Sequence, residues 1–234
     1  SFELLHTALI VHDDVIDRDF VRRGIPNISG TYRDHAVDRG ASVEIAEHRG
    51  VSAAVIAGDL ALFNSYRLME RSGVAAAMRD RLLEVLDEAM FASAAGELID
   101  VDFSIDPHTP VVEDILQMER LKTAVYSFEA PLQAGAILAG ASEQIVATLG
   151  DFGREIGIAY QIVDDVLGVF GEESFTGKTT IGDLREGNRT GLIAFACATP
   201  QWEELRHLIG KHDLTEAEAQ TARDMLEECG ARTF

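Results

Sequence analysis

Two pairs of adjacent aspartates lie in otherwise apolar, helix-forming stretches of this chain. The first pair is Asp13 and Asp14, with Asp17 one helical turn further on, and the second pair is Asp164 and Asp165. An acidic pair in an apolar helix is unfavourable to bury unless a cation neutralises it. Carboxylate oxygens are the ligands that Mg²⁺ prefers. Both pairs are therefore candidate magnesium sites.

Basic residues follow each acidic pair: Arg22 and Arg23 come after the first, and Lys178 comes after the second. A single acidic pair is more often a solvated helix face. Two pairs in apolar surroundings, each with cationic residues close in sequence, favour a functional interpretation. The pattern predicts divalent metal ions that hold a phosphorylated substrate.

The composition limits the possible partners. The 234 residues include 40 acidic and 20 basic side chains, which gives a net charge of −20. Such a surface repels nucleic acid, so no nucleic-acid partner is expected. No apolar run approaches the ~18 residues of a membrane span, so no transmembrane segment is predicted. Two cysteines without metal-type or disulfide-type spacing indicate a cytoplasmic protein.

Long stretches rich in Ala, Leu and Glu carry apolar residues at helical spacing, and turn residues separate them. Alternating strand patterns are absent from the sequence. The predicted helices cover residues 2–19, 40–71, 74–101, 111–139, 143–170, 191–198, 201–209 and 215–229. The pattern predicts an all-α protein, one large helical bundle over residues 1–234. The chain begins inside a helical pattern and ends abruptly, so we expect N-terminal helices, and the C-terminal end, to be missing.

Residues 3–26 resemble the first aspartate-rich region of the trans-isoprenyl diphosphate synthases, the polyprenyl synthetase family. Further motifs of that family follow in the same order: Gly58-Asp59, Gly96-Glu97 with Asp100, Lys122-Thr123-Ala124, Tyr160-Gln161 before Asp164-Asp165, Gly177-Lys178, and residues 182–187. The resemblance covers residues 1 to about 195, and its ordered motifs make it specific. It implies the isoprenoid-synthase fold with a central active-site cavity, active as a homodimer.

The resemblance also implies the reaction, a Mg²⁺-dependent head-to-tail condensation of isopentenyl diphosphate with an allylic diphosphate to a trans-prenyl diphosphate. It implies that Asp13, Asp17 and Asp164 bind three Mg²⁺ ions, and that Asp14 and Asp165 support them. The side chains implied to bind the allylic diphosphate are Arg22, Lys122, Thr123, Gln161 and Lys178. Those implied to bind isopentenyl diphosphate are His6 and Arg23.

The helix before the first aspartates suggests a product length. Leu9, Leu5 and Phe2 lie 4, 8 and 11 residues before Asp13, at depths of roughly 6, 12 and 16 Å along the helix. Farnesyl-type members of the family carry aromatics at the fourth and fifth positions, where this chain has Leu9 and Ala8. We predict that Leu5 partly obstructs the pocket and Phe2 forms its floor. The product would be C20, geranylgeranyl diphosphate, or else C25. Alternatively, Leu5 and Phe2 pack in the core.

Departures from the family pattern leave other functions open. Gly168 stands where the family often has an aspartate, Asn188 replaces a lysine, Glu97 replaces a glutamine, and the family's upstream Gly-Lys-Arg segment has no counterpart. A non-catalytic partner subunit of an active synthase is therefore a second hypothesis. A class I terpene cyclase is a third, which the matches at residues 22–24 and 122–123 argue against.

Overall fold

The computed structural model describes residues 1–105, 108, 110–171 and 181–234. They form two compact units, one of residues 1–90 with 134–141 and the other of residues 91–133 with 142–234. Two of the boundaries between the units fall inside helices α4 and α6, and the third falls between α6 and α7. Apart from one hairpin of two-residue strands, the regular elements of the described residues are helical, which confirms the predicted all-α class.

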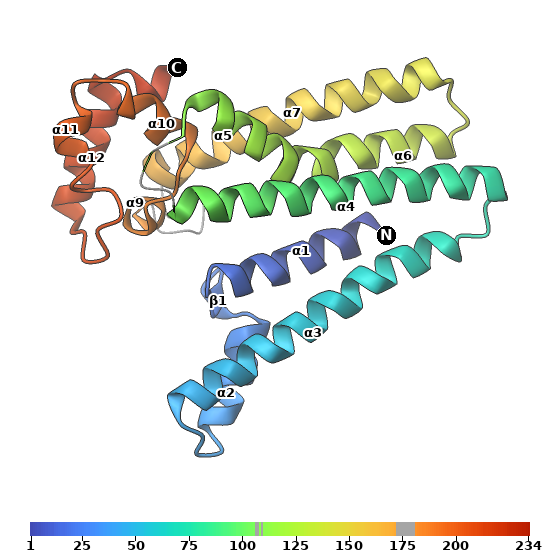
Figure 1. Ribbon diagram of the computed structural model, residues 1–234, viewed down its shortest axis with the longest axis horizontal. Coiled ribbons are helices and arrows are strands. Elements are labelled where there is room, and N and C mark those ends of the chain that lie inside the picture. The colour runs from blue at the N-terminus through green and yellow to red at the C-terminus, as the bar shows by residue number, and fades with distance from the viewer. Residues whose placement is uncertain (106–107, 109, 172–180) are drawn as a thin grey trace. The chain divides into compact units, whose positions relative to one another are not determined.

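The first unit contains α1 (Phe2–Ile16), β1 (Val21–Arg22), β2 (Ile25–Pro26), α2 (Ile28–Val37), α3 (Val43–Glu70) and the first half of α4 (Ala76–Ile105) (Figure 1). The second contains the rest of α4, α5 (Val112–Glu119), the π-helix η1 (Arg120–Glu129), α6 (Ala130–Leu138), α7 (Glu143–Phe170), α9 (Gly182–Glu186), α10 (Gly191–Cys197), α11 (Trp202–Leu205), α12 (Glu216–Glu228) and the 3₁₀ turn η2 (Ala231–Thr233). The last residues of α6 belong to the first unit.

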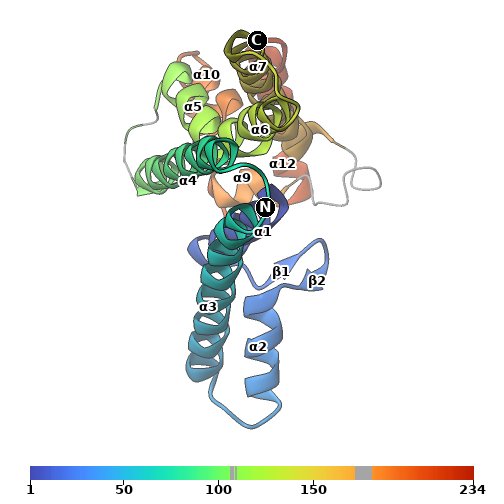
Figure 2. The same cartoon turned by 90° about the vertical axis from the view of Figure 1, so that its right-hand side faces the viewer.

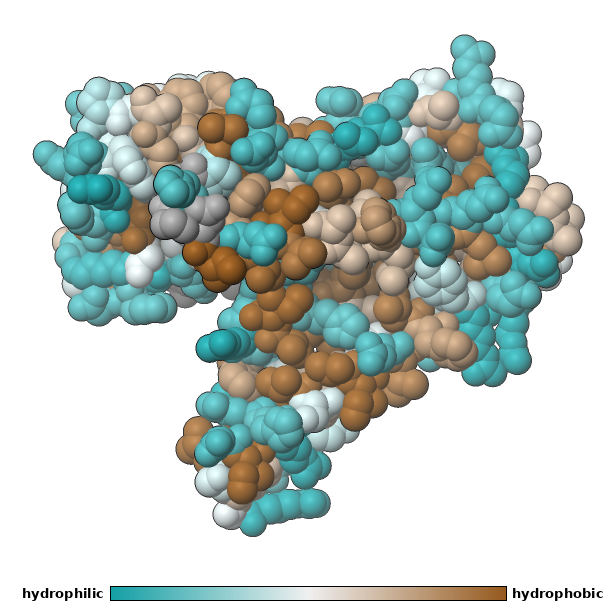
Figure 3. Space-filling view, viewed as in Figure 1, coloured by the Kyte–Doolittle hydropathy of each residue, from teal (hydrophilic) through white to brown (hydrophobic). Residues whose placement is uncertain are grey.

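In the first unit, α1 and α2 both pack on α3 through small residues of α3. A Cβ atom on Gly50 would lie 2.3 Å from the carbonyl oxygen of Ser29 in α2, and one on Gly58 would lie 2.3 Å from Nε2 of His12 in α1. Only glycine allows these approaches. The opposite face of α3 carries large apolar side chains that are exposed, and apolar atoms are visible on the surface of the N-terminal helices in Figure 3.

A tight hairpin follows α1 and leads into α2 (Figure 2). Arg18, with φ of 60°, ends the helix earlier than the predicted residue 19. Arg23 (φ 54°) and Gly24 (φ 75°) are the central residues of the hairpin, and positive φ at both positions defines a type I′ turn. Helix α2 was not predicted, because its mixed polar sequence lacks a clear apolar stripe.

The second unit is built around the packing of α7 on η1. Ser142 caps α7 by accepting a hydrogen bond from the N–H of Ile145, and the helix spans the predicted residues 143–170. Gly153 and Gly157 allow close approach, because Cβ atoms there would lie 2.8 Å from Glu129 Cα and 2.5 Å from Ala124 Cβ. The predicted helix 111–139 is one helical run, but its middle third is a π-helix.

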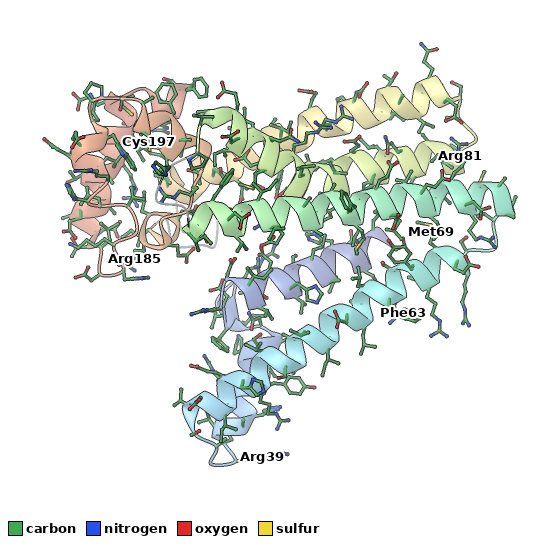
Figure 4. All side chains as sticks on the ribbon, viewed as in Figure 1. Arg39, Phe63, Met69, Arg81, Arg185 and Cys197 are labelled. Carbon is green, nitrogen blue, oxygen red and sulfur yellow. The ribbon has the colours of Figure 1, made fainter. Side chains whose placement is uncertain are left out.

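The C-terminal helices of this unit form their own hydrophobic core. Its fully buried members include Leu184, Leu205, Leu214 and Leu226. Arg185, labelled in Figure 4, donates from Nε and Nη2 to the carbonyl oxygen of Leu214, at 3.1 and 2.7 Å. Helix α12 begins with a capping box, in which Thr215 and Glu218 exchange reciprocal hydrogen bonds between side chain and backbone.

No helix in the part of the chain that the structure describes combines the length and apolarity needed to cross a bilayer.

Candidate active site

The first aspartates lie where α1 ends. Asp13 and Asp14 occupy the last turn of the helix, and Asp17 is its C-terminal cap. The N–H of Asp17 donates to the carbonyl oxygen of Asp13 at 2.9 Å, so the two residues are one helical turn apart, as the spacing predicted. Asp14 is buried, Asp13 is half-buried and Asp17 is exposed. The turn therefore presents carboxylates at three different depths.

Arg22 bridges two of these carboxylates. Its Nε donates to Oδ1 of Asp14 at 2.7 Å and its Nη2 to Oδ2 of Asp13 at 3.1 Å. Burial lowers the pKa of Arg22, but the hydrogen bonds and negative charges of Asp14 and Asp13 outweigh it, and the net shift is upward. Burial, together with the charge of Asp14, raises the pKa of nearby Asp19. The carboxylates of Asp13 and Asp14 are thus paired with the positively charged guanidinium of Arg22.

This donor set fits a divalent metal ion. Asp13 and Asp17 offer hard oxygen ligands one helical turn apart, and Mg²⁺ is usually bound through one or two carboxylates together with water and phosphate oxygens. The guanidinium of Arg22 is the counterion of Asp13 and Asp14. Arg23, next to Arg22, is exposed at the tip of the hairpin turn. The hairpin therefore gives the two arginines different surroundings.

The remaining predicted residues of α1 divide between its buried and accessible faces. Leu5 and Ala8 are fully buried, whereas Phe2 and Leu9 are partly exposed. His6, predicted to bind isopentenyl diphosphate, is exposed. The accessible candidates for the chain-length pocket are therefore Phe2 and Leu9.

His12 explains why Gly58 and Asp59 occur together. Its ring lies against the bare backbone of Gly58, and its Nε2 is 3.4 Å from Oδ1 of Asp59. The contact fixes the end of α1 that carries Asp13 onto α3. The Gly58-Asp59 motif thus holds the segment of α1 that carries the first aspartates against α3.

The second aspartates, Asp164 and Asp165, lie in the last two turns of α7, both half-buried. Gln161, predicted to line the allylic site, donates from Nε2 to Oδ1 of Asp165 at 3.0 Å. Glu119 at the end of α5 is 3% exposed, and its carboxyl group interacts electrostatically with that of Asp165.

Gly168 leaves room for another carboxylate. A Cβ atom on Gly168 would lie 1.8 Å from Oδ2 of Asp183, so an aspartate at this position is incompatible with the observed place of Asp183. Asn188, at the position where a lysine was expected, donates from Nδ2 to Oδ1 of Asp183 at 3.2 Å. Asp183 of α9 therefore places a carboxylate beside α7 at the position where the helix itself has Gly168.

Lys122 lies in η1 between two carboxylates of α4. Its Nζ is 2.7 Å from Oδ2 of Asp100 and 3.1 Å from Oε2 of Glu97. Gly96 permits this arrangement, because a Cβ atom there would lie 2.2 Å from the backbone nitrogen of Lys122. Thr123 follows in the same π-helical segment. Glu97, noted as a departure from the family pattern, thus provides a charged partner for Lys122.

The described residues gather the predicted site into two groups, one in each unit. In the first unit, Arg22 joins Asp13 and Asp14. In the second, Gln161 joins Asp165, and Lys122 joins the acidic residues of α4. Among the described residues, no three His, Cys, Asp or Glu side chains form a group that could hold a metal ion. Lys178 lies outside the described residues.

Two acidic residues of the second group were missed as site candidates. Asp183 lies within the motif at residues 182–187, and its carboxylate could have been marked as a candidate from that motif. Glu119 gave no signal, because a lone glutamate in a helix is normally solvated. Its burial beside Asp165 became visible only in the folded chain.

The buried carboxyl pair predicts how stability changes with pH. Burial, together with the charge of Asp165, raises the pKa of Glu119 to about 9, and burial raises that of Asp165 to about 6. Between the usual pKa of Glu119, 4.5, and the raised value, the folded state binds more protons than the unfolded state. The free energy of unfolding should therefore fall as pH rises through this window, by up to about 1.4 kcal/mol per pH unit.

Denaturant unfolding at a series of pH values from 5 to 9 checks this prediction. Glu119→Gln cannot lose a proton, so it should flatten the decline. The matched control is Glu113→Gln, an exposed residue of the same helix, which should leave the slope unchanged. Equal slopes for the wild-type protein and Glu119→Gln would contradict the prediction.

Comparison with known proteins identifies the class of this fold and site. Residues 1–226 match the polyprenyl synthetase family, and the chain belongs to that family. This confirms the resemblance that the ordered motifs indicated. Relatives of the chain are prenyl diphosphate synthases, which are prenyltransferases.

Two relatives define the similarity more closely. A geranylfarnesyl diphosphate synthase of Aeropyrum pernix is 33% identical over all of this chain and 68% of its own length. A geranylgeranyl diphosphate synthase of Sulfolobus acidocaldarius is 28% identical over 97% of this chain and 65% of its own. The chain thus spans about two thirds of the length of these relatives.

Among solved structures, a geranylgeranyl pyrophosphate synthase from Corynebacterium glutamicum, complexed with isoprenyl diphosphate and magnesium, has a TM-score of 0.89 at 32% identity. The match covers 99% of this chain and 66% of that one. A polyprenyl synthase from Caulobacter crescentus, complexed with calcium and isoprenyl diphosphate, has a TM-score of 0.78 at 29% identity, and the match covers 99% and 64%.

Proposed function

We propose that the full-length protein condenses isopentenyl diphosphate with an allylic diphosphate to give a trans-prenyl diphosphate. The observation that carries this proposal is the carboxylate turn of α1, in which Asp13 and Asp14 form an ion pair with Arg22 and Asp17 lies one helical turn from Asp13. Family membership over residues 1–226 and the activities for which the relatives are named support the same activity.

The residues proposed to hold Mg²⁺ are Asp13 and Asp17 in the first unit and Asp164 in the second, with three ions in all. The solved relatives crystallised with magnesium or calcium and an isoprenyl diphosphate support this choice of ion and substrate. When bound, the ions supply positive charge that neutralises the leaving diphosphate. Asp14 and Asp165 hold neighbouring side chains in place, Arg22 and Gln161 respectively.

The protein's own cations bind and orient the substrates. Arg22 and Lys122 would contact the allylic diphosphate, with Lys178 from outside the described residues, and Arg23 and His6 would contact isopentenyl diphosphate. These contacts stabilise the charge that develops when the allylic C–O bond breaks and its electron pair leaves with the diphosphate. The double bond of isopentenyl diphosphate then forms the new C–C bond with the allylic cation. The departing diphosphate takes the proton that is lost.

The activity is tested by incubating the full-length protein with Mg²⁺, labelled isopentenyl diphosphate and, separately, C5, C10 and C15 allylic diphosphates. Chromatography of the products should show Mg²⁺-dependent elongation. A folded protein that elongates none of these starters would exclude the synthase function and support the partner-subunit hypothesis. Cyclised hydrocarbon products would support the terpene cyclase.

We infer that the product is C20, with C25 as the alternative. Phe2 is the partly exposed aromatic at the predicted floor, whereas the nearer Leu5 is fully buried. Phe2→Ala should therefore lengthen the main product by one or more isoprene units, measured by chromatography. Leu4→Ala, also partly exposed and one residue off the stripe, is the control that should keep the wild-type length. An unchanged product after Phe2→Ala would refute Phe2 as the floor.

We also infer a homodimer located in the cytoplasm. Ile56, Leu60 and Phe63 lie on one face of α3 and are 60%, 58% and 63% exposed. An uncharged row of this kind suits self-association of a chain with net charge −20. Leu60→Glu should therefore lower the mass measured by light scattering to that of a monomer. Val37→Glu, at an exposed apolar residue of α2, should not. A wild-type monomer, or a dimeric Leu60→Glu variant, would contradict the inference.

A further inference from the structure

The two ion pairs of Arg22 differ in length and in the solvent exposure of the carboxylate. The contact of Nε with Asp14 is 2.7 Å long, and the side chain of Asp14 is only 6% exposed. The contact of Nη2 with Asp13 is 3.1 Å long, and the side chain of Asp13 is 24% exposed. A buried charge that loses its partner is strongly destabilising, whereas an exposed charge that loses its partner is solvated by water at little cost. The contact with Asp13 is therefore the one that can be exchanged.

The backbone around Arg22 keeps the residue in reach of both carboxylates. Arg22 pairs with Ile25 across the hairpin, and the type I′ turn at Arg23 and Gly24 closes it tightly. The N–H of Asp19 donates to the carbonyl oxygen of Asp14 at 2.8 Å, which ties the start of the hairpin to α1. A guanidinium has several donors in a fixed plane, so one donor can stay in place while another changes partner.

We propose that Arg22 is a two-position side chain: Nε stays on Asp14, while Nη2 rests on Asp13 until a divalent cation binds there and then turns to the diphosphate. Asp14 is thus a positioning residue for Arg22. Arg22 competes with the metal ion when diphosphate is absent, and assists when diphosphate is present. This inference rests on the proposed function, since it requires a metal ion at Asp13 and a diphosphate beside it.

The opposite signs of these two effects give a sharp test. Calorimetric titration of the full-length protein with Mg²⁺ alone should show about two- to fivefold tighter binding for Arg22→Gln than for the wild-type protein, because a competing ion pair is lost. Titration with inorganic diphosphate at saturating Mg²⁺ should show at least about tenfold weaker binding for the same variant, because a charge-assisted hydrogen bond is lost.

The matched control is Arg79→Gln. Arg79 also contacts two carboxylates, those of Glu70 and Asp80, and its loss changes the net charge by the same amount. Both affinities should stay within about twofold of the wild-type values in this control, as surface substitutions usually do. A uniform charge effect would instead shift Arg79→Gln and Arg22→Gln alike and would overturn the proposal.

Asp14→Asn tests the anchor. Without the charge of Asp14, Arg22 should be held less well, so diphosphate affinity should fall while Asp13 remains able to bind Mg²⁺. If Asp14→Asn instead abolishes Mg²⁺ binding in a protein with an unchanged circular dichroism spectrum, Asp14 is a metal ligand and the proposal is wrong. Unchanged or weaker Mg²⁺ binding by Arg22→Gln would also overturn it.

These outcomes are separable from failure of the proposed function. Elongation by the wild-type protein together with unchanged Mg²⁺ affinity in Arg22→Gln would leave the synthase activity standing and overturn the two-position side chain. If Arg22→Gln binds Mg²⁺ more tightly but the wild-type protein elongates no starter, the side-chain exchange is supported and the synthase activity is overturned. A wild-type protein that binds neither Mg²⁺ nor diphosphate would overturn both.

Discussion

Asp13→Ala is expected to lower the rate of prenyl chain elongation by more than about a hundredfold. Asp13 is the half-buried carboxylate that Arg22 contacts, and Asp17, one turn away, is the second ligand that we propose for the same ion. Changing groups that merely orient a metal ligand already reduces affinity or activity by about 10–100-fold, so loss of a ligand itself should exceed this range. The measurement is the initial rate with labelled isopentenyl diphosphate and an allylic starter at several Mg²⁺ concentrations.

The control for this variant is Asp38→Ala, which removes an exposed aspartate at the end of α2. It changes the net charge equally and should retain the wild-type rate within about twofold, as surface substitutions usually do. An Asp13→Ala enzyme that keeps a third or more of the wild-type rate would show that Asp13 is not a metal ligand.

Gly96→Ala is expected to unfold more easily and to displace Lys122. The added Cβ atom would lie 2.2 Å from the backbone nitrogen of Lys122, and backbone cannot move aside as a flexible side chain can. Overpacking of this kind typically reduces the free energy of unfolding by about 1–3 kcal/mol. Denaturant unfolding measures this loss, and titration with inorganic diphosphate reports on Lys122.

The matched control is Gly135→Ala in α6, where a Cβ atom would meet nothing within 4 Å. This substitution should stabilise the protein by about 0.5–1 kcal/mol, because alanine favours a helix over glycine. Equal effects of the two substitutions would contradict the close approach of α4 and η1 at Gly96.

The sequence was sufficient for those parts of the fold that depend on local patterns. Helix α7 has the predicted bounds because Ser142 and the apolar period mark its start and its course. Helix α2 was missed because its apolar residues are too few to make a stripe, and it is held by Asn27, which accepts from Gly30, and by packing on α3. The π-helix has no local signature beyond Pro131, which has no N–H to donate to the preceding turn.

In the candidate site, too, the residues were predictable from the sequence but their contacts were not. The aspartates and Arg22 were predicted from their order in the chain, but the choice of Asp14 for Nε and Asp13 for Nη2 depends on a turn with two positive φ values. The partnership of Glu119 with Asp165 joins residues of two helices, and no spacing in the sequence announces it. Long-range burial of polar groups is what single-sequence patterns do not encode.

The π-helix η1 changes the direction in which side chains point along the helical run from α5 to α6. A π turn accommodates about one more residue than an α turn, which rotates the downstream helix by roughly 100° relative to the upstream one. Lys122, early in η1, can therefore be aligned to α4 at Gly96, while Glu129, at its end, is aligned independently to Gly153 of α7. If η1 were an ordinary α-helix, the angle between Lys122 and Glu129 around the helix axis would change, and only one of these two alignments could survive.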